Sequence, residues 1–185
     1  MSGRSHGLES LKADRVTAAI VAESEWPPLP SPHTRVGVGG VLIRDGRALV
    51  NRAVYRNRFT IPSGYVERGE TLVGALVREF EEETGVTVKV DRLVLTRHKV
   101  LSTEESDVYF GFRVEPVTGT PEARPPEIAE VREVPLAEAM TAEWISEFSR
   151  MAIRLAADPV RGWPLANWRG GEFPGLANEV FPPVD

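Results

Sequence analysis

The chain has 185 residues, and its shares of hydrophobic residues (42%) and charged residues (26%) are ordinary for a globular protein with a buried core. The absence of cysteine excludes disulfide bonds, zinc ribbons and thiol catalysis, and no apolar run approaches the roughly 18 residues that a membrane span needs. A net charge of −5 argues against a general nucleic-acid-binding protein, because such proteins usually carry an excess of basic residues.

Residues 1–35 are predicted to form an arm that precedes the main domain. Apolar residues at helical spacing predict a helix over residues 8–23. Residues 25–35 contain four prolines, which exclude a helix and favour an extended connector. The apolar stretch VTAAIVA follows charges of both signs, which is not typical of a secretory signal, and we therefore expect a cytoplasmic protein.

The main domain is predicted to begin with a β-hairpin. Residues 36–43 form a short apolar run that is suited to a buried strand, and residues 48–54 form the return strand. The Asp-Gly pair between these two strands is typical of a tight turn. Residues 55–64 are predicted to be a loop, because they contain a proline and end in a glycine.

The rest of the domain is predicted to alternate between strands and two helices. The first helix covers residues 71–84, and Gly85 stands where a C′ glycine belongs. A second helical segment covers residues 135–157, with a break near Met140-Thr141. Strands are predicted over residues 86–90, 92–101, 108–117 and 127–134. This order predicts an α+β fold, an α/β/α sandwich with a mixed sheet between helices, for residues 36–157.

The C-terminal segment, residues 158–185, is predicted to be irregular but packed. It holds five prolines and four glycines together with several aromatic residues. Because disordered tails are usually poor in aromatic residues, we expect it to cover the body of the domain or a second subunit. A loose tail is the alternative.

The first predicted helix carries an unusual run of acidic residues near its C-terminal end. Like charges at helical spacing repel each other, and negative charge at this end opposes the helix dipole. Glu79, Glu82 and Glu83 share one face of the helix, whereas Glu81 points away from them. Clustered carboxylates are relieved by Mg²⁺ or Mn²⁺, which prefer carboxylate and phosphate oxygens. The alternative is a solvated acidic face that is partly neutralised by Arg78.

The residues around this run form a longer pattern. It consists of Gly64, Glu70, Arg78, Glu79, Phe80, Glu82, Glu83, Gly85 and Val86. The pattern resembles the Nudix box at every fixed position, and nine constrained positions in 23 residues make a highly specific signal. The resemblance implies the Nudix fold and a divalent-metal-dependent hydrolase. Its substrate would be a nucleoside diphosphate linked to another group, cleaved at the pyrophosphate by metal-activated water.

The resemblance also implies a set of metal ligands. Glu82 and Glu83 would be the main ligands of Mg²⁺ or Mn²⁺. Glu79 would be a further ligand or would orient the attacking water. The carbonyl of Ser63, just before the first glycine of the box, would be a backbone ligand.

Two supporting roles follow from the same resemblance. Arg78 would hold the carboxylates in place through an ion pair with Glu79 or Glu70, and Glu70 would support the loop. Many family members use a late glutamate outside the box as the general base, for which Glu127 is the first candidate and Glu130 the second. The alternative for both is an exposed acid on a strand.

Candidate substrate contacts come from basic and aromatic residues outside the box. Guanidinium groups bind phosphate in a bidentate manner, and three arginines precede the box: Arg52, Arg56 and Arg58. A second basic cluster consists of Arg97, His98 and Lys99. Three aromatic residues are candidates for stacking on a base, although aromatic residues in strands are more often core: Tyr55, Phe59 and Tyr109. For both basic clusters, ordinary surface charge is the alternative.

The substrate itself is left open by the sequence. The segment IPSGYVERGET is similar to the loops of ADP-ribose and related dinucleotide pyrophosphatases, but Leu101 stands where many ADP-ribose members carry a proline. A housekeeping role on free nucleotides or on a nucleotide sugar stays open. A nucleotide-sensing module without turnover is the alternative, and the intact box argues against it. We expect a homodimer, because many family members are dimers and the arm and tail need a surface to cover.

Overall fold

A computed structural model describes residues 33–102, 105–159, 162–164, 166–167 and 179–180. The predicted helix over residues 8–23, most of the connector and most of the C-terminal segment lie outside the described residues. Within the described part of the chain, no helix is both long and apolar enough to cross a membrane.

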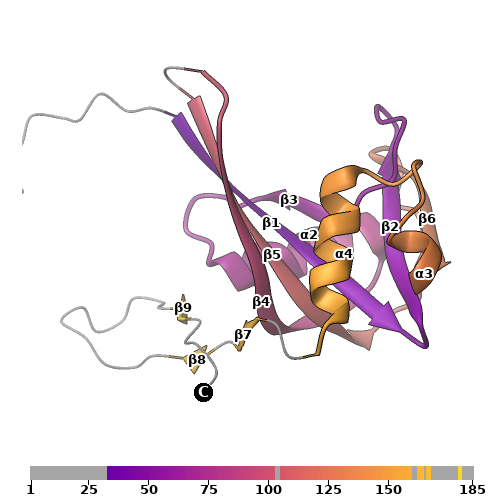
Figure 1. The fold of residues 1–185 in the computed structure, drawn as a ribbon. Helices are drawn as coiled ribbons and strands as arrows, with labels where there is room; N and C mark the ends of the chain where they lie inside the picture. Colours follow the sequence, from indigo (N-terminus) through magenta and orange to yellow (C-terminus); the bar gives the residue numbers. More distant parts are fainter. Residues whose placement is uncertain (1–32, 103–104, 160–161, 165, 168–178, 181–185) are drawn as a thin grey trace, which may run out of the picture. The chain divides into compact units, whose positions relative to one another are not determined.

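The centre of the domain is a mixed sheet of seven strands (Figure 1). The strands are β1 (His33–Arg44), β2 (Arg47–Ala53), β3 (Ser63–Tyr65), β4 (Thr87–Val100), β5 (Glu105–Thr118), β6 (Ile128–Pro135) and β7 (Trp163–Pro164). Their order is β6-β2-β1-β5-β4-β7, and β3 pairs with β1 off this path. The β1–β5 pair is parallel, whereas the other neighbours are antiparallel.

Helices cover both faces of this sheet. Helix α2 (Leu72–Thr84) lies behind it in Figure 1, and α4 (Glu147–Ala157) lies in front. Side chains alternate along β1, so that Val38 and Leu42 join the core under α2 while Val41 joins the core under α4. The prediction of an α/β/α sandwich with a mixed sheet is therefore confirmed.

Helix α2 forms where the sequence predicted it because both ends carry capping residues. The side chain of Thr71 accepts a hydrogen bond from the Gly74 N–H, 3.0 Å away. Gly85 adopts φ 70°, and its N–H donates to the Glu81 carbonyl at 2.8 Å. Leu76 and Phe80 are fully buried and anchor the helix, since burying such a side chain contributes about 1.5–3 kcal/mol.

Two predictions about strands were wrong. Residues 86–101 were predicted to form two strands, but β4 is continuous, and irregular pairing between Val90 and Arg92 absorbs the change of register. Residues 55–64 were predicted to be a loop throughout, but β3 starts at Ser63 and pairs with Gly37–Gly39 of β1. Gly37 and Gly39 leave room for the ring of Tyr109, which a Cβ at either position would contact too closely.

The second helical segment is interrupted for longer than the sequence predicted. Helix α3 (Leu136–Ala139) and α4 are separated by residues 140–146. Ile145 in this connection forms a β-bridge with Phe59, and the Ser146 side chain caps α4 by accepting from the Ser149 N–H at 3.2 Å. In the C-terminal segment, β7 extends the main sheet, and β8 (Ala166–Asn167) pairs with β9 (Glu179–Val180).

Candidate active site

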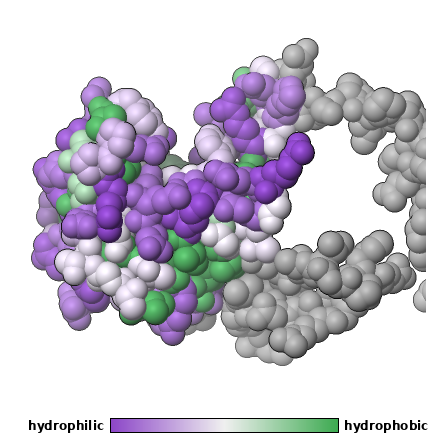
Figure 2. Space-filling model, turned by 180° about the vertical axis from the view of Figure 1, so that it is seen from behind, coloured by the Kyte–Doolittle hydropathy of each residue, from purple (hydrophilic) through white to green (hydrophobic). Residues whose placement is uncertain are grey.

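The acidic face of α2 lies against the turn that enters β3. The Cβ of an alanine at position 64 would lie 1.9 Å from the Glu79 carboxyl carbon, so that only glycine allows this approach. The face of the molecule seen in Figure 2, behind the sheet of Figure 1, carries a broad hydrophilic band. At the start of β3, the Ser63 backbone N–H donates to the Glu83 side chain of α2, so that the strand and the helix meet through polar groups.

Glu83 is the most enclosed of the three carboxylates on this face. Its Oε2 atom accepts hydrogen bonds from the Ser63 backbone N–H at 2.7 Å and from the Asn51 side chain at 2.8 Å. Burial nevertheless raises the pKa of Glu83 to about 7, and the charges of Glu79 and Glu127 act in the same direction. The ionised form of Glu83 is therefore not fully stabilised by its surroundings, and added positive charge would favour it.

Arg78 connects the other carboxylates to the turn. Its Nε and Nη2 atoms bind Glu70 at 2.7 and 2.9 Å. Its Nη1 donates to Glu79 at 3.0 Å and to Glu82 at 3.1 Å, and Nη2 also donates to the Tyr65 carbonyl at 3.0 Å. These contacts use all five N–H groups of the guanidinium.

Two of these carboxylates have pKa shifts in opposite directions. Hydrogen bonding from Arg78 lowers the pKa of Glu70 to about 2. Burial raises the pKa of Glu79 even though Arg78 acts against it. Glu70 is therefore a permanent anion that fixes Arg78, while Glu79 is an acid that a cation would help to ionise.

The donor set on this face fits a divalent metal ion in type. Carboxylate oxygens and a backbone carbonyl are the ligands that Mg²⁺ and Mn²⁺ prefer, and the raised pKa of Glu79 and Glu83 indicates a site that favours added positive charge. Among the described residues, no three acidic or histidine side chains converge closely enough to hold an ion as they stand. Arg78 partly neutralises Glu79 and Glu82 in this arrangement, and Glu82, whose side chain is 61% exposed, is free to reorient.

A cavity of about 320 Å³ opens beside the acidic face. Glu79 and Glu83 line it together with Glu127, which is exposed and precedes β6. Glu130 does not line this cavity and instead binds Arg132 at 2.5 Å and Arg52 at 3.4 Å. The structure therefore brings the first of the two candidate bases, but not the second, to the acidic face.

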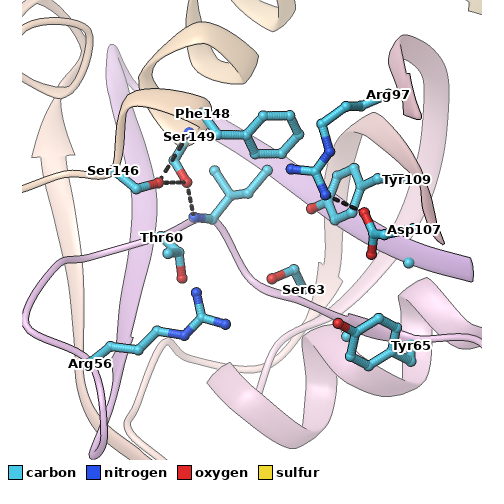
Figure 3. A pocket seen from close by; sticks show the side chains of 13 residues that line it. Arg56, Thr60, Ser63, Tyr65, Arg97, Asp107, Tyr109, Ser146, Phe148 and Ser149 are labelled. Carbon is cyan, nitrogen blue, oxygen red and sulfur yellow. Dashed lines mark hydrogen bonds and ion pairs between the residues drawn. The ribbon is translucent and has the colours of Figure 1, made fainter. Parts of the chain in front are cut away.

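A second cavity, of about 310 Å³, adjoins the first (Figure 3). The two cavities share the lining residues Arg56, Thr60, Ser63, Gly64 and Tyr65. The far wall of the second cavity consists of Arg97, Asp107, Tyr109, Ser146, Phe148 and Ser149. Together the cavities form a continuous polar site on both sides of β3.

The predicted substrate residues divide into two groups. Arg56 lines both cavities, and Tyr109 and Tyr55 line one each. Arg52 does not reach either cavity, because it faces away from its neighbour Asn51 and lies over the ring of the buried Phe59. Arg97 lines the second cavity, whereas the other three basic candidates are exposed and line neither cavity: Arg58, His98 and Lys99.

Sequence reasoning missed several residues that shape the site. Asn51 donates to Glu83, accepts from the Thr60 hydroxyl at 3.2 Å and exchanges backbone hydrogen bonds with Thr60. A buried asparagine inside the apolar strand LVNRAV is a signal that could have revealed it. Asp107 and Phe148 carried no comparable signal, because only the fold brings them beside β3.

The chain was compared with known proteins. It matches the NUDIX domain family over residues 33–154. An ADP-ribose pyrophosphatase of Methanocaldococcus jannaschii is 38% identical over 65 residues, which are 34% of this chain and 38% of that protein. A MutT-like protein of Streptomyces ambofaciens is 42% identical over 72 residues, 38% of this chain and 44% of that protein. The matched part of the chain thus spans less than half the length of either relative.

Solved structures share the fold. A NUDIX hydrolase from Nitrosomonas europaea superposes with a TM-score of 0.62 at 21% identity. The match covers 75% of this chain and 99% of that structure. At this identity the likeness concerns the architecture alone.

Proposed function

The chain belongs to the Nudix family, and on this premise we propose that it is a pyrophosphohydrolase that cleaves a nucleoside diphosphate derivative with the help of a divalent metal ion. The observation that supports this most strongly is the acidic face of α2, which lies against the Ser63–Gly64 turn and opens into a cavity that also holds Glu127. ADP-ribose-like compounds, nucleotide sugars and dinucleotides are the candidate substrates.

Hydrolases of this family generally use divalent metal ions such as Mg²⁺. In this chain the residues that would hold Mg²⁺ or Mn²⁺ are Glu79, Glu82 and Glu83, with the Ser63 carbonyl as a backbone ligand. A bound ion supplies neutralisation of phosphate charge and a lowered pKa of coordinated water.

The chain's own residues supply the remaining functions. Arg78 fixes the direction of the acidic side chains through its contacts with Glu70 and the Tyr65 carbonyl. Arg56, at the junction of the two cavities, is placed to donate to the phosphates of the substrate. Glu127 accepts the proton of the attacking water, since it faces the same cavity as Glu79 and Glu83.

Replacing Glu82 by glutamine is expected to lower kcat by more than about 100-fold while the fold stays intact. Losing a group that only supports a metal ligand already costs about 10–100-fold, and Glu82 is proposed as a ligand itself. Glu81→Gln is the matched control, because Glu81 lies one position away on the same helix and is exposed. The measurement is steady-state hydrolysis of ADP-ribose with Mg²⁺ or Mn²⁺, and near-full activity of Glu82→Gln would contradict the proposed role.

Glu127 and Glu130 can be separated by a matched pair of variants. We expect Glu127→Gln to lower kcat by about 10²–10⁴-fold. Glu130→Gln should leave kcat nearly unchanged, because Arg132 holds the pKa of Glu130 below its usual range and the side chain lies outside the cavity. The reverse pattern would assign the base to Glu130.

The proposed activity is tested by a substrate panel that distinguishes turnover from binding alone. Purified protein with Mg²⁺ or Mn²⁺ is incubated with ADP-ribose, nucleotide sugars and dinucleotides, and the products are identified by mass spectrometry. Release of a nucleoside monophosphate supports hydrolysis. Binding of these compounds without turnover would favour the nucleotide-sensing module instead.

Other expectations from the sequence stay predictions. The homodimer was inferred from the arm and the C-terminal segment, which lie largely outside the described residues. The cytoplasmic location and the boundaries at residues 35 and 157 are likewise predictions. Sedimentation velocity would show whether the purified chain is a dimer.

A further inference from the structure

The second cavity is built differently from the acidic one. Figure 3 shows Arg97, Tyr109 and Asp107 on one side of it and Arg56 and Thr60 on the other. Its volume of about 310 Å³ lies at the low end of the range for ligand sites, about 300–1,000 Å³, which suits a small group. Because it shares β3 with the acidic cavity, a group bound here would be continuous with a diphosphate bound there.

The aromatic side chains of this cavity are already occupied. The guanidinium of Arg97 lies 5.2 Å from the ring centre of Tyr109 and 4.5 Å from that of Phe148. The rings of Tyr109 and Phe148 also pack edge to face at 5.0 Å. A planar base would therefore find no open aromatic face on the far wall, and Tyr65 at the opening is the exposed aromatic residue of this cavity.

The far wall offers a carboxylate instead. Asp107 is only 6% exposed, and Arg97 Nη2 donates to its Oδ1 atom. Figure 3 shows its other carboxylate oxygen facing the gap between Ser63 and Tyr65. The buried Nε of Arg97 lacks a hydrogen-bond partner among the residues that the structure describes. Buried polar groups are normally paired, so this polar wall is incomplete without a ligand or water.

The chemistry of this wall selects among ligands. A carboxylate oxygen accepts hydrogen bonds and repels anions, which excludes a terminal phosphate beside Asp107. A sugar presents several hydroxyl donors in different directions and needs no aromatic face. The neighbouring Arg97 can donate to sugar oxygens that do not face Asp107.

We propose that this cavity binds the sugar that is linked to the nucleoside diphosphate, and that Asp107, oriented by Arg97, determines specificity by accepting hydrogen bonds from its hydroxyl groups. This inference rests on the proposed function of the adjoining acidic cavity. It places ADP-ribose-like compounds and nucleotide sugars ahead of nucleoside triphosphates as substrates.

The test compares ADP-ribose with ADP, which carries the same adenosine and diphosphate but no second sugar. Binding of both is measured by calorimetry, and hydrolysis of ADP-ribose by steady-state kinetics. Asp107→Asn keeps an acceptor for Arg97 and removes the charge. We expect it to weaken ADP-ribose binding by about 10-fold, as loss of hydrogen bonds to a charged group does, and to change ADP binding less than about 2-fold.

Two further variants make the result specific. Glu105→Gln is the matched control, because Glu105 lies on the same strand, pairs with Arg35 at 3.6 Å and lines neither cavity; it should change neither affinity. Arg97→Lys keeps the positive charge but loses the planar fork that orients Asp107, and it should shift the same ratio of affinities. If thermal unfolding shows that Asp107→Asn is not folded, Arg97→Lys serves as the test in its place.

The outcomes separate the two proposals. If the wild type hydrolyses ADP-ribose but Asp107→Asn and Arg97→Lys keep its preference for ADP-ribose over ADP, the sugar assignment is overturned. If the wild type hydrolyses no nucleoside diphosphate derivative, the proposed function fails, while a preference for ADP-ribose that depends on Asp107 would still support a sugar-binding cavity.

Discussion

Replacing Glu83 by glutamine is expected to abolish hydrolysis and, without metal, to raise the thermal stability of the protein at pH 8. The pKa of Glu83 is about 7 in the folded protein against an ordinary value of 4.5. The folded state therefore binds the proton more tightly than the unfolded state, and stability falls as pH rises from about 4.5 to 7. Glutamine cannot ionise and avoids this loss.

The expected gain can be stated as a magnitude. A shift of this size corresponds to about 3 kcal/mol at pH 8 and to roughly 6–12 °C in Tm. Both hydrogen bonds to Glu83, from Asn51 and Ser63, reach the same atom, Oε2. A glutamine whose amide oxygen takes that position keeps both bonds, so that charge is the main difference between the variants.

The measurement is thermal unfolding in EDTA at pH 5 and pH 8. The difference between Glu83→Gln and the wild type should be large at pH 8 and small at pH 5. Added Mn²⁺ should stabilise the wild type more than the variant. Glu81→Gln, on the exposed side of the same helix, should leave Tm nearly unchanged. A variant that is less stable than the wild type at pH 8 would disprove this interpretation of the buried carboxylate.

Replacing Arg78 by lysine is expected to lower both activity and stability although the charge is kept. All five N–H groups of Arg78 are used, and they reach three carboxylates and the Tyr65 carbonyl. An ammonium group has three donors and no planar fork, so at least two of these bonds are lost. We expect kcat to fall by about 100-fold, because Glu79 and Glu82 lose their fixed directions.

The loss of stability is tempered by partial exposure. Breaking one side of a buried ion pair costs about 3–5 kcal/mol, and because the Arg78 side chain is 25% exposed we expect about 2 kcal/mol. Urea denaturation gives this value directly. Arg124→Lys is the control, since Arg124 pairs with Glu122 at 3.0 Å on the surface and should cost less than about 0.5 kcal/mol. Equal losses in the two variants would show that Arg78 is only a surface cation.

The parts of the fold that the sequence predicted well depend on local spacing. Helix α2 carries its caps, its apolar stripe and its acidic face within one stretch, so that residues 71–85 were sufficient to define it. The resemblance to the Nudix box also led us to expect the Ser63–Gly64 turn beside this helix, because it implied that the Ser63 carbonyl is a metal ligand. Glu127 was expected as a late acid and lies at the acidic cavity.

The parts that the sequence did not predict depend on contacts between distant segments. The second cavity combines β4, β5, the turn before β3 and the start of α4, and nothing in the sequence links Asp107 to Phe148. Arg52 was chosen for its charge, although its place next to Asn51 on a strand already puts the two on opposite faces. The continuous β4 was divided at Val90 because a sequence pattern does not show that a bulge restores pairing.

The proposed chemistry and the proposed selection depend on separate elements of this fold. The proposed metal ligands lie on α2, whereas the far wall of the second cavity comes from β4, β5 and the start of α4, and β3 lines both cavities. Evolution can therefore alter the far wall without disturbing the hydrolytic machinery. A laboratory library that randomises positions 97, 107 and 148 would explore new specificities while the acidic face of α2 stays unchanged.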